Sequence, residues 1–115
     1  MEDILIGLLE SFKYPVFRQG SLGDDPYPAT FITFWNSTED GVSFYDNADF
    51  LVDHEYSVNV YSNDPSVTYS LLTEVRTLLK ANGWITLTRG YDVASDEVTH
   101  TGRGLRVAYL QTETI

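Results

Sequence analysis

One stretch of the sequence carries the complete signature of a helix: DPSVTYSLLTEVRTLLKANG, residues 64–83. Asp64 is a typical N-cap, and Pro65 suits the first helical position because its missing N–H would have no partner there. Lys80 falls in the last turn, where a cation complements the helix dipole, and Gly83 can adopt the left-handed conformation that ends a helix. Both ends of this helix are therefore predicted from local chemistry.

The same stretch also shows which side of the helix is buried. Apolar residues recur every three or four positions, namely at Val67, Leu71, Leu72, Val75, Leu78 and Leu79. This spacing is typical of one apolar helix face. We expect Leu71, Val75 and Leu78 to face a sheet.

Upstream of the helix, polar and apolar residues alternate from Val52 to Val60. Alternation with a period of two predicts a half-buried strand, with one face formed by Val52, His54, Tyr56, Val58 and Val60. The other expected elements are a helix over 3–12, strands over 16–18, 29–35, 84–89 and 105–111, and a loop over 19–28. The strand over 29–35 should be covered on both faces, because β-branched and aromatic residues fill it. Residues 36–49 are expected to form a polar connection with a turn at 39–41 and at most a short edge strand over 42–45.

The order of these elements predicts a single α+β domain over residues 1–115. The expected sheet is mainly antiparallel, and two helices pack on one of its faces. A chain of 115 residues is long enough for one modest hydrophobic core. We find no internal repeat, linker or low-complexity segment.

The composition excludes several kinds of function. The chain has no cysteine, which rules out disulfides, thiolate nucleophiles and zinc–sulfur sites. Its net charge is −10, so it lacks the basic surface that sequence-specific binding of nucleic acid requires. The first twelve residues are too short and too acidic for a signal peptide, and no apolar run is long enough to cross a membrane. We therefore expect the protein to be cytosolic where it is made and to contact no membrane.

The most unusual segment is RGYDVASDEVTHTGRG, residues 89–104, which mixes charges, a histidine and glycines between two apolar segments. Unpaired charges lose their hydration on burial, so this run should lie at the surface as a loop. The simplest interpretation is a solvated hairpin connection with turn glycines. Its length also favours a partner-facing loop that is poorly ordered until a neighbour contacts it.

We find no set of residues that predicts an active site. His54 should point away from Asp53 and Glu55, because neighbouring side chains on a strand face opposite ways. His100 with Asp92, Asp96 and Glu97 could in principle bind a cation, but this spacing matches no known coordination loop. Gly102-Arg-Gly104 lacks the Lys-Ser/Thr pair of a phosphate loop, and no serine lies in a Gly-x-Ser-x-Gly motif. The sequence thus predicts no enzyme, no cofactor and no metal.

Several motifs together resemble a known family: Tyr14-Pro15-Val16, YPATFITF at 27–34, Tyr45-Asp-Asn47, Tyr61–Pro65, Gly83-Trp84 and Tyr91–Gly104. In this order they look like the tail-terminator or head–tail joining (neck) proteins of long-tailed bacteriophages and prophages. The resemblance covers nearly the whole chain, and its most specific parts are Tyr61–Pro65 and Tyr91–Gly104. It rests on motifs that have no known chemistry.

This resemblance implies a structural virion protein. Such proteins form a ring, commonly a hexamer, that caps the head-proximal end of the tail tube and joins it to the neck, with DNA passing through. The implied partners are other copies of the chain, the tail-tube protein and a neck or head-completion protein. We expect the partner interface to include Tyr91, Asp92, Asp96, Glu97, His100 and Arg103. Arg103, flanked by glycines, would reach a carboxylate on an acidic neighbour.

Two alternatives remain open at this stage. The first is a different neck or tail component, such as a head-closure or tail-tube protein. The second, more distant, is a small ligand-binding or metal-binding domain. The position of the protein in a virion would separate them.

Overall fold

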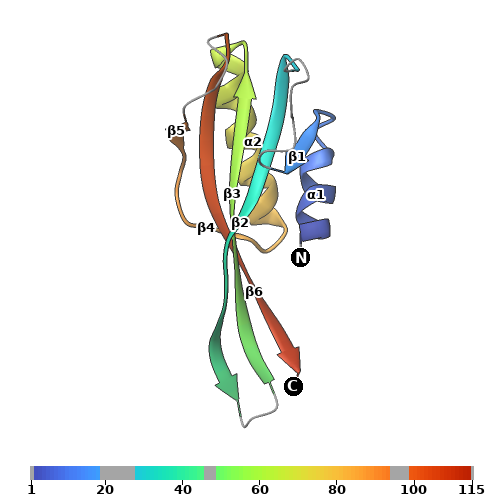
Figure 1. The fold of residues 1–115 in the computed structure, drawn as a ribbon, viewed down its shortest axis with the longest axis vertical. Coiled ribbons are helices and arrows are strands. Elements are labelled where there is room, and N and C mark those ends of the chain that lie inside the picture. The colour runs from blue at the N-terminus through green and yellow to red at the C-terminus, as the bar shows by residue number, and fades with distance from the viewer. Residues whose placement is uncertain (1, 19–27, 46–48, 94–98, 115) are drawn as a thin grey trace.

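The computed structural model describes residues 2–18, 28–45, 49–93 and 99–114. Within these ranges the chain forms two helices and six strands (Figure 1). In chain order these are α1 (Glu2–Glu10), β1 (Val16–Arg18), β2 (Thr30–Tyr45), β3 (Asp49–Ser62), α2 (Pro65–Ala81), β4 (Ile85–Thr86), β5 (Tyr91–Val93) and β6 (Thr101–Thr114). The predicted α+β class is confirmed.

The strands form one sheet in the order β1-β2-β3-β6-β4, and β5 also pairs with β6. All pairings are antiparallel except that of β1 with β2. Since β2 and β6 are both antiparallel to β3, which lies between them, they run in the same direction.

Helix α2 begins and ends as the local chemistry predicts. The Asp64 carboxylate accepts a hydrogen bond from the Ser66 N–H, at 3.0 Å, and Pro65 is the first helical residue. Gly83 follows the C-cap with φ of 88°, in the left-handed region that glycine favours. The buried face differs slightly from the prediction, because Leu79 is fully buried whereas Leu78 is only half-buried.

One core lies between the sheet and the two helices. Leu5 and Leu9 of α1 and the buried face of α2 pack against apolar residues of the three long strands. The strand residues in this core are Ile32, Phe34, Tyr56, Val58, Val60, Leu105 and Val107. Figure 1 shows α2 crossing behind the sheet and α1 beside β1. This arrangement agrees with the prediction of two helices on one face.

In the part of the sheet that the helices cover, the face turned away from the helices is also largely buried. Phe31, Ser57 and Asn59, whose side chains point away from the core, are each at most 4% exposed. Phe31 stacks on the ring of Tyr61 with centroids 5.1 Å apart. The predicted strand over 29–35 is therefore covered on both faces as far as Phe34, whereas β3 is not simply half-buried as its alternation indicated.

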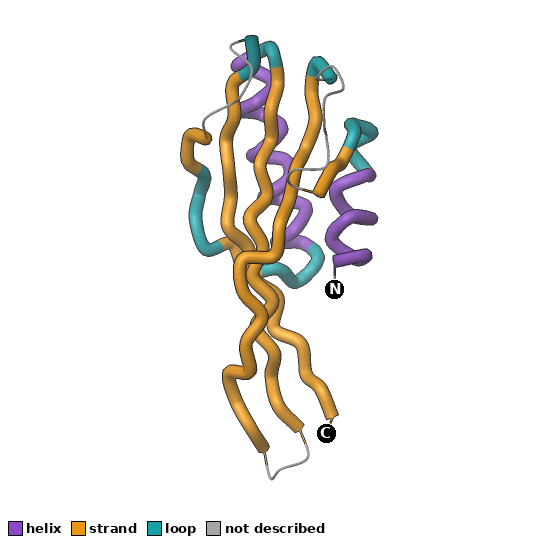
Figure 2. Tube along the Cα trace, viewed as in Figure 1, coloured by secondary structure: helices purple, strands orange, loops and turns teal. Residues whose placement is uncertain are grey.

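The sheet continues well beyond the helices as a three-stranded arm (Figures 1 and 2). We define the arm as residues 40–45 of β2, 49–53 of β3 and 110–114 of β6, which pair row by row from Asp40, Asp53 and Leu110 to Tyr45, Asp49 and Thr114. It gives the molecule its elongated shape, with extents of 53 × 28 × 22 Å. Neither helix lies over the arm in Figure 1.

The arm corrects the prediction for residues 36–49. The expected turn at Glu39-Asp40-Gly41 is a continuous part of β2, paired with residues 52–54 of β3. The expected short edge strand over 42–45 is the end of the same long strand. Cross-strand pairing with β3 overrides the turn-like local composition here. The expected loop over 19–28 lies almost wholly outside the described residues.

Two further strand boundaries differ from the prediction. The strand expected over 84–89 is limited to Ile85–Thr86, and Trp84 before it is buried against Tyr56 and Tyr109. The last strand starts at Thr101 rather than at residue 105.

Candidate functional site

Two parts of the charged run 89–104, residues 91–93 and 101–104, are paired strands and not one long loop. Tyr91, Asp92 and Val93 of β5 pair with Gly104, Arg103 and Gly102 of β6. The hairpin interpretation is thus confirmed, while the prediction of a fifteen-residue loop is wrong. Asp96 and Glu97 lie outside the described residues.

The two glycines of β6 serve packing and not turns. A Cβ on Gly102 would lie 2.7 Å from the ring of Tyr61. A Cβ on Gly104 would collide with Asn59 Oδ1 and lie 2.7 Å from the ring of Tyr91. Glycine inside a strand often marks such a close approach of neighbouring groups. The absence of side chains at these positions lets β5 and Tyr61 close over β6.

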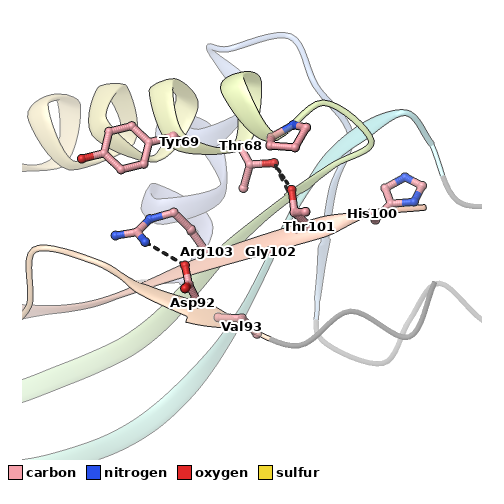
Figure 3. Close-up of a pocket in the computed structure, with 9 residues that line it drawn as sticks. Thr68, Tyr69, Asp92, Val93, His100, Thr101, Gly102 and Arg103 are labelled. Carbon is pink, nitrogen blue, oxygen red and sulfur yellow. Dashed lines mark hydrogen bonds and ion pairs between the residues drawn. The ribbon is translucent and has the colours of Figure 1, made fainter. Parts of the chain in front are cut away.

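Arg103 projects from the other side of β6, toward α2. Its guanidinium donates to Asp92 Oδ1 at 2.8 Å and lies 5.1 Å from the centre of the Tyr69 ring (Figure 3). The side chain of Arg103 is 25% exposed and that of Asp92 is 90% exposed, so water screens the pair and it contributes less than about 1 kcal/mol. The cation–ring contact adds about 0.5–1 kcal/mol. Arg103 is therefore held in a strand within its own chain, contrary to the prediction of a loop arginine free to reach a neighbour.

A hollow of about 440 Å³ lies between the start of α2 and the β5–β6 hairpin. It is lined by Pro65, Thr68, Tyr69, Asp92, Val93, His100, Thr101, Gly102 and Arg103 (Figure 3). The hydroxyls of Thr68 and Thr101, 3.0 Å apart, connect the helix to β6 at one side. Three of the predicted interface residues, Asp92, His100 and Arg103, thus line one concave surface. The fourth described one, Tyr91, packs over Gly104 and is not among the lining residues.

The two histidines are engaged in structural contacts. His100 Nε2 lies 2.8 Å from the Pro28 carbonyl oxygen and therefore donates to it, while Nδ1 accepts from the Thr99 hydroxyl at 3.0 Å. His54 is 5% exposed and its Nε2 lies 2.8 Å from Gln111 Oε1. Glu55 points to the other face, where it accepts from Arg106 at 3.0 Å. Among the described residues, no three acidic or histidine side chains gather as a metal ion would require.

Sequence reasoning missed the helix side of this hollow. Thr68 and Tyr69 belong to α2, and the packing of α2 against β6 brings them beside Thr101 and Arg103. Tyr69 is 63% exposed, which is unusual for a large aromatic ring. The sequence shows that a tyrosine stands at this position, but it does not show that the ring is exposed. An exposed helix residue cannot be distinguished as a contact residue by periodicity alone.

No model of a known protein family matches the chain, and no curated protein matches its sequence. Neither helix in the described part of the chain has the length and apolar character needed to span a membrane.

Proposed function

We propose that this protein is a structural component of a long-tailed bacteriophage particle. In this proposal it forms a ring, with six copies as the expected number, at the head-proximal end of the tail. The ring ends growth of the tail tube and joins the tail to the neck, and DNA passes through it. The proposal assigns the protein no catalytic role.

The arm is the observation that carries this proposal. A small sheet that no helix covers can bury little of its apolar surface within one chain. Three strands need a packed face to be stable alone. In the described chain β1 pairs with only residues 32–34 of β2, and β4 with only residues 107–108 of β6. Both outer edges of the arm therefore offer unpaired backbone groups, which proteins normally cover or block. Assembly with neighbouring chains would cover them.

The hollow adds a second contact surface at the other end of the molecule. It combines an exposed ring, Tyr69, with the Arg103–Asp92 pair, and tyrosine and arginine are the residues most enriched at protein interfaces. A ring protein at a junction needs contact surfaces toward both of its neighbours. An elongated chain with the arm at one end and the hollow at the other meets this requirement.

The test is to remove the gene from its phage or prophage and to examine the particles by electron microscopy. We expect tails of uncontrolled length together with heads that lack tails, and restoration by the wild-type gene. Gold labelling of a tagged protein should mark the head–tail junction. Label along the whole tail would instead indicate a tail-tube protein, and label on tailless heads a head-closure protein. Normal particles without the protein would overturn the proposal.

A variant test connects the hollow to this role. Arg103→Ala should reproduce the defective tails while leaving the protein folded, with Arg18→Ala, at the exposed end of the half-buried strand β1, as a matched control. Normal particles from Arg103→Ala would remove Arg103 from the joining surface without affecting the location of the protein.

A further inference from the structure

The two free edges of the arm can pair with each other between neighbouring copies. We propose that β2 of one copy pairs in parallel with β6 of the next, with Trp35 beside Leu110. This inference rests on the ring in the proposed function and specifies how the ring is built.

The direction of the strands favours a closed ring. Because β2 and β6 run the same way, joining these two edges generates a parallel pair, and each copy is related to the next by a rotation. Repeating the same step closes a cycle. Pairing of two β2 edges would instead be antiparallel and would stop at a dimer.

The register follows from where each edge becomes free. Among the described residues, β1 covers β2 as far as Phe34, so Trp35 is the first residue of that edge with no described strand beside it. Strand β4 covers β6 as far as Ala108, so the other edge becomes free at Tyr109. Pairing cannot start higher, because β1 and β4 would occupy the same space.

Side-chain direction then selects between Tyr109 and Leu110 as the partner of Trp35. Trp35 points away from the helices, since its neighbour Phe34 points into the core. Tyr109 packs against the core, whereas Leu110 points away from it. Paired residues in adjacent strands share a face, so Trp35 matches Leu110.

Exposure supports the same pair. Trp35 is 37% exposed and Leu110 is 44% exposed, and both are large apolar side chains next to free backbone edges. Such positions normally carry blocking charges, because a bare apolar edge invites pairing. Contact between these two side chains would remove both from water.

The resulting stagger is compatible with a closed sheet. In one chain Trp35 is level with Ser57 and Arg106, and Leu110 lies four residues further along β6. Each copy would therefore shift by about 13 Å along the strands relative to the next, at ~3.3 Å per residue. A constant stagger of this kind is what tilts the strands of a closed barrel.

Irregularities in β2 make the edge selective. The pairing with β3 shifts register between Asn36 and Thr38 and again between Gly41 and Ser43. Bulges increase local twist and discourage indiscriminate pairing. The β6 edge has no such irregularity, because its register with β3 is continuous. Every copy therefore offers a regular β6 edge with which β2 of the neighbouring copy can pair.

Cysteine cross-linking tests the register directly, because the chain contains no cysteine of its own. Neighbouring strands place paired residues within the Cα separation of about 4.4–6.8 Å that a disulfide needs. Under mild oxidation the double variant Trp35→Cys/Leu110→Cys should lose its monomer band and give a ladder of covalent oligomers, which reducing agent reverses. Each single variant should remain a monomer on the same gel. The matched control is Trp35→Cys/Tyr69→Cys, since Tyr69 is exposed on α2, on the other side of the sheet.

Two measurements on the wild-type protein keep the inference falsifiable if the cysteines disturb folding. Native mass should show a closed oligomer, and hydrogen exchange should slow at residues 35–40 and 110–114 on assembly. An oligomer without a ladder and without this protection would overturn the edge pairing while leaving the ring intact. Dimers from Trp35→Cys alone would show a twofold contact, and a monomer at every concentration would overturn the ring as well.

Discussion

Replacing Leu79 with alanine tests the buried face of α2. Leu79 is fully buried against the sheet, whereas Leu78 beside it is half-buried. Truncation of a fully buried leucine costs about 2–5 kcal/mol, through lost apolar burial and the cavity left behind. For a chain of this size about 1 kcal/mol lowers the Tm by roughly 4 °C, so Leu79→Ala should lower it by roughly 8–20 °C.

The control for this experiment is Leu78→Ala. It removes the same atoms from a position that is already partly in water, so the loss should be less than half as large. Urea denaturation followed by circular dichroism measures both free energies, and an unchanged slope would show that the unfolded states are comparable. Equal losses, or a larger loss for Leu78→Ala, would mean that the helix presents a different face to the sheet.

Three further predictions concern the hairpin, the ion pair and assembly. Gly104→Ala should lower the free energy of unfolding by about 1–3 kcal/mol, because the added methyl group overpacks the site. Gly7→Ala, in α1 with nothing within 4 Å, should raise it by about 0.5–1 kcal/mol. Thermal melts in which the Tm of both variants shifts in the same direction would contradict this. Asp92→Asn should lower the free energy of unfolding by less than about 1 kcal/mol, and a larger loss that persists in high salt would show a stronger bond to Arg103 than its exposure implies. Added salt should strengthen self-assembly, because residues 36–62 and 107–115 contain no Lys or Arg and their acidic groups repel one another between copies. Dissociation of the oligomer at rising ionic strength, measured by sedimentation, would argue against the pairing of arms.

The local sequence was sufficient to predict those helices and strands whose ends carry capping or breaking residues. Helix α2 could be predicted because Asp64, Pro65 and Gly83 each have one dominant use, and strand β1 was bounded by Pro15 before it. The arm could not be predicted in the same way. Glu39-Asp40-Gly41 has the composition of a turn, and only its pairing with β3, a contact between distant residues, makes it strand.

The candidate site shows the same division. Asp92, His100 and Arg103 could be predicted because a charged run between apolar segments must reach the surface, and all three line the hollow. Gly102 and Gly104 were assigned to turns, because glycine in sequence does not distinguish a turn from a close contact with rings such as Tyr61. Tyr69 and Trp35 could not be recognised at all, since their roles depend on which strands end beside them.

The row-by-row pairing of β3 with β6 has a consequence for how the chain acquires its shape. The same two strands that pair Ser62 with Thr101 beside the helices also pair Asp49 with Thr114 at the tip, where the intervening segment is much longer. Pairing Ser62 with Thr101 closes the shorter of the two loops, so it loses less chain entropy and should happen first. The core then holds these strands in place. The ladder should therefore zip from the helices toward the tip, and it should fray in the reverse order. Since β2 and β3 pair at the tip across only three intervening residues, β6 is the part of the arm that is added last, and its end can detach while the body stays folded.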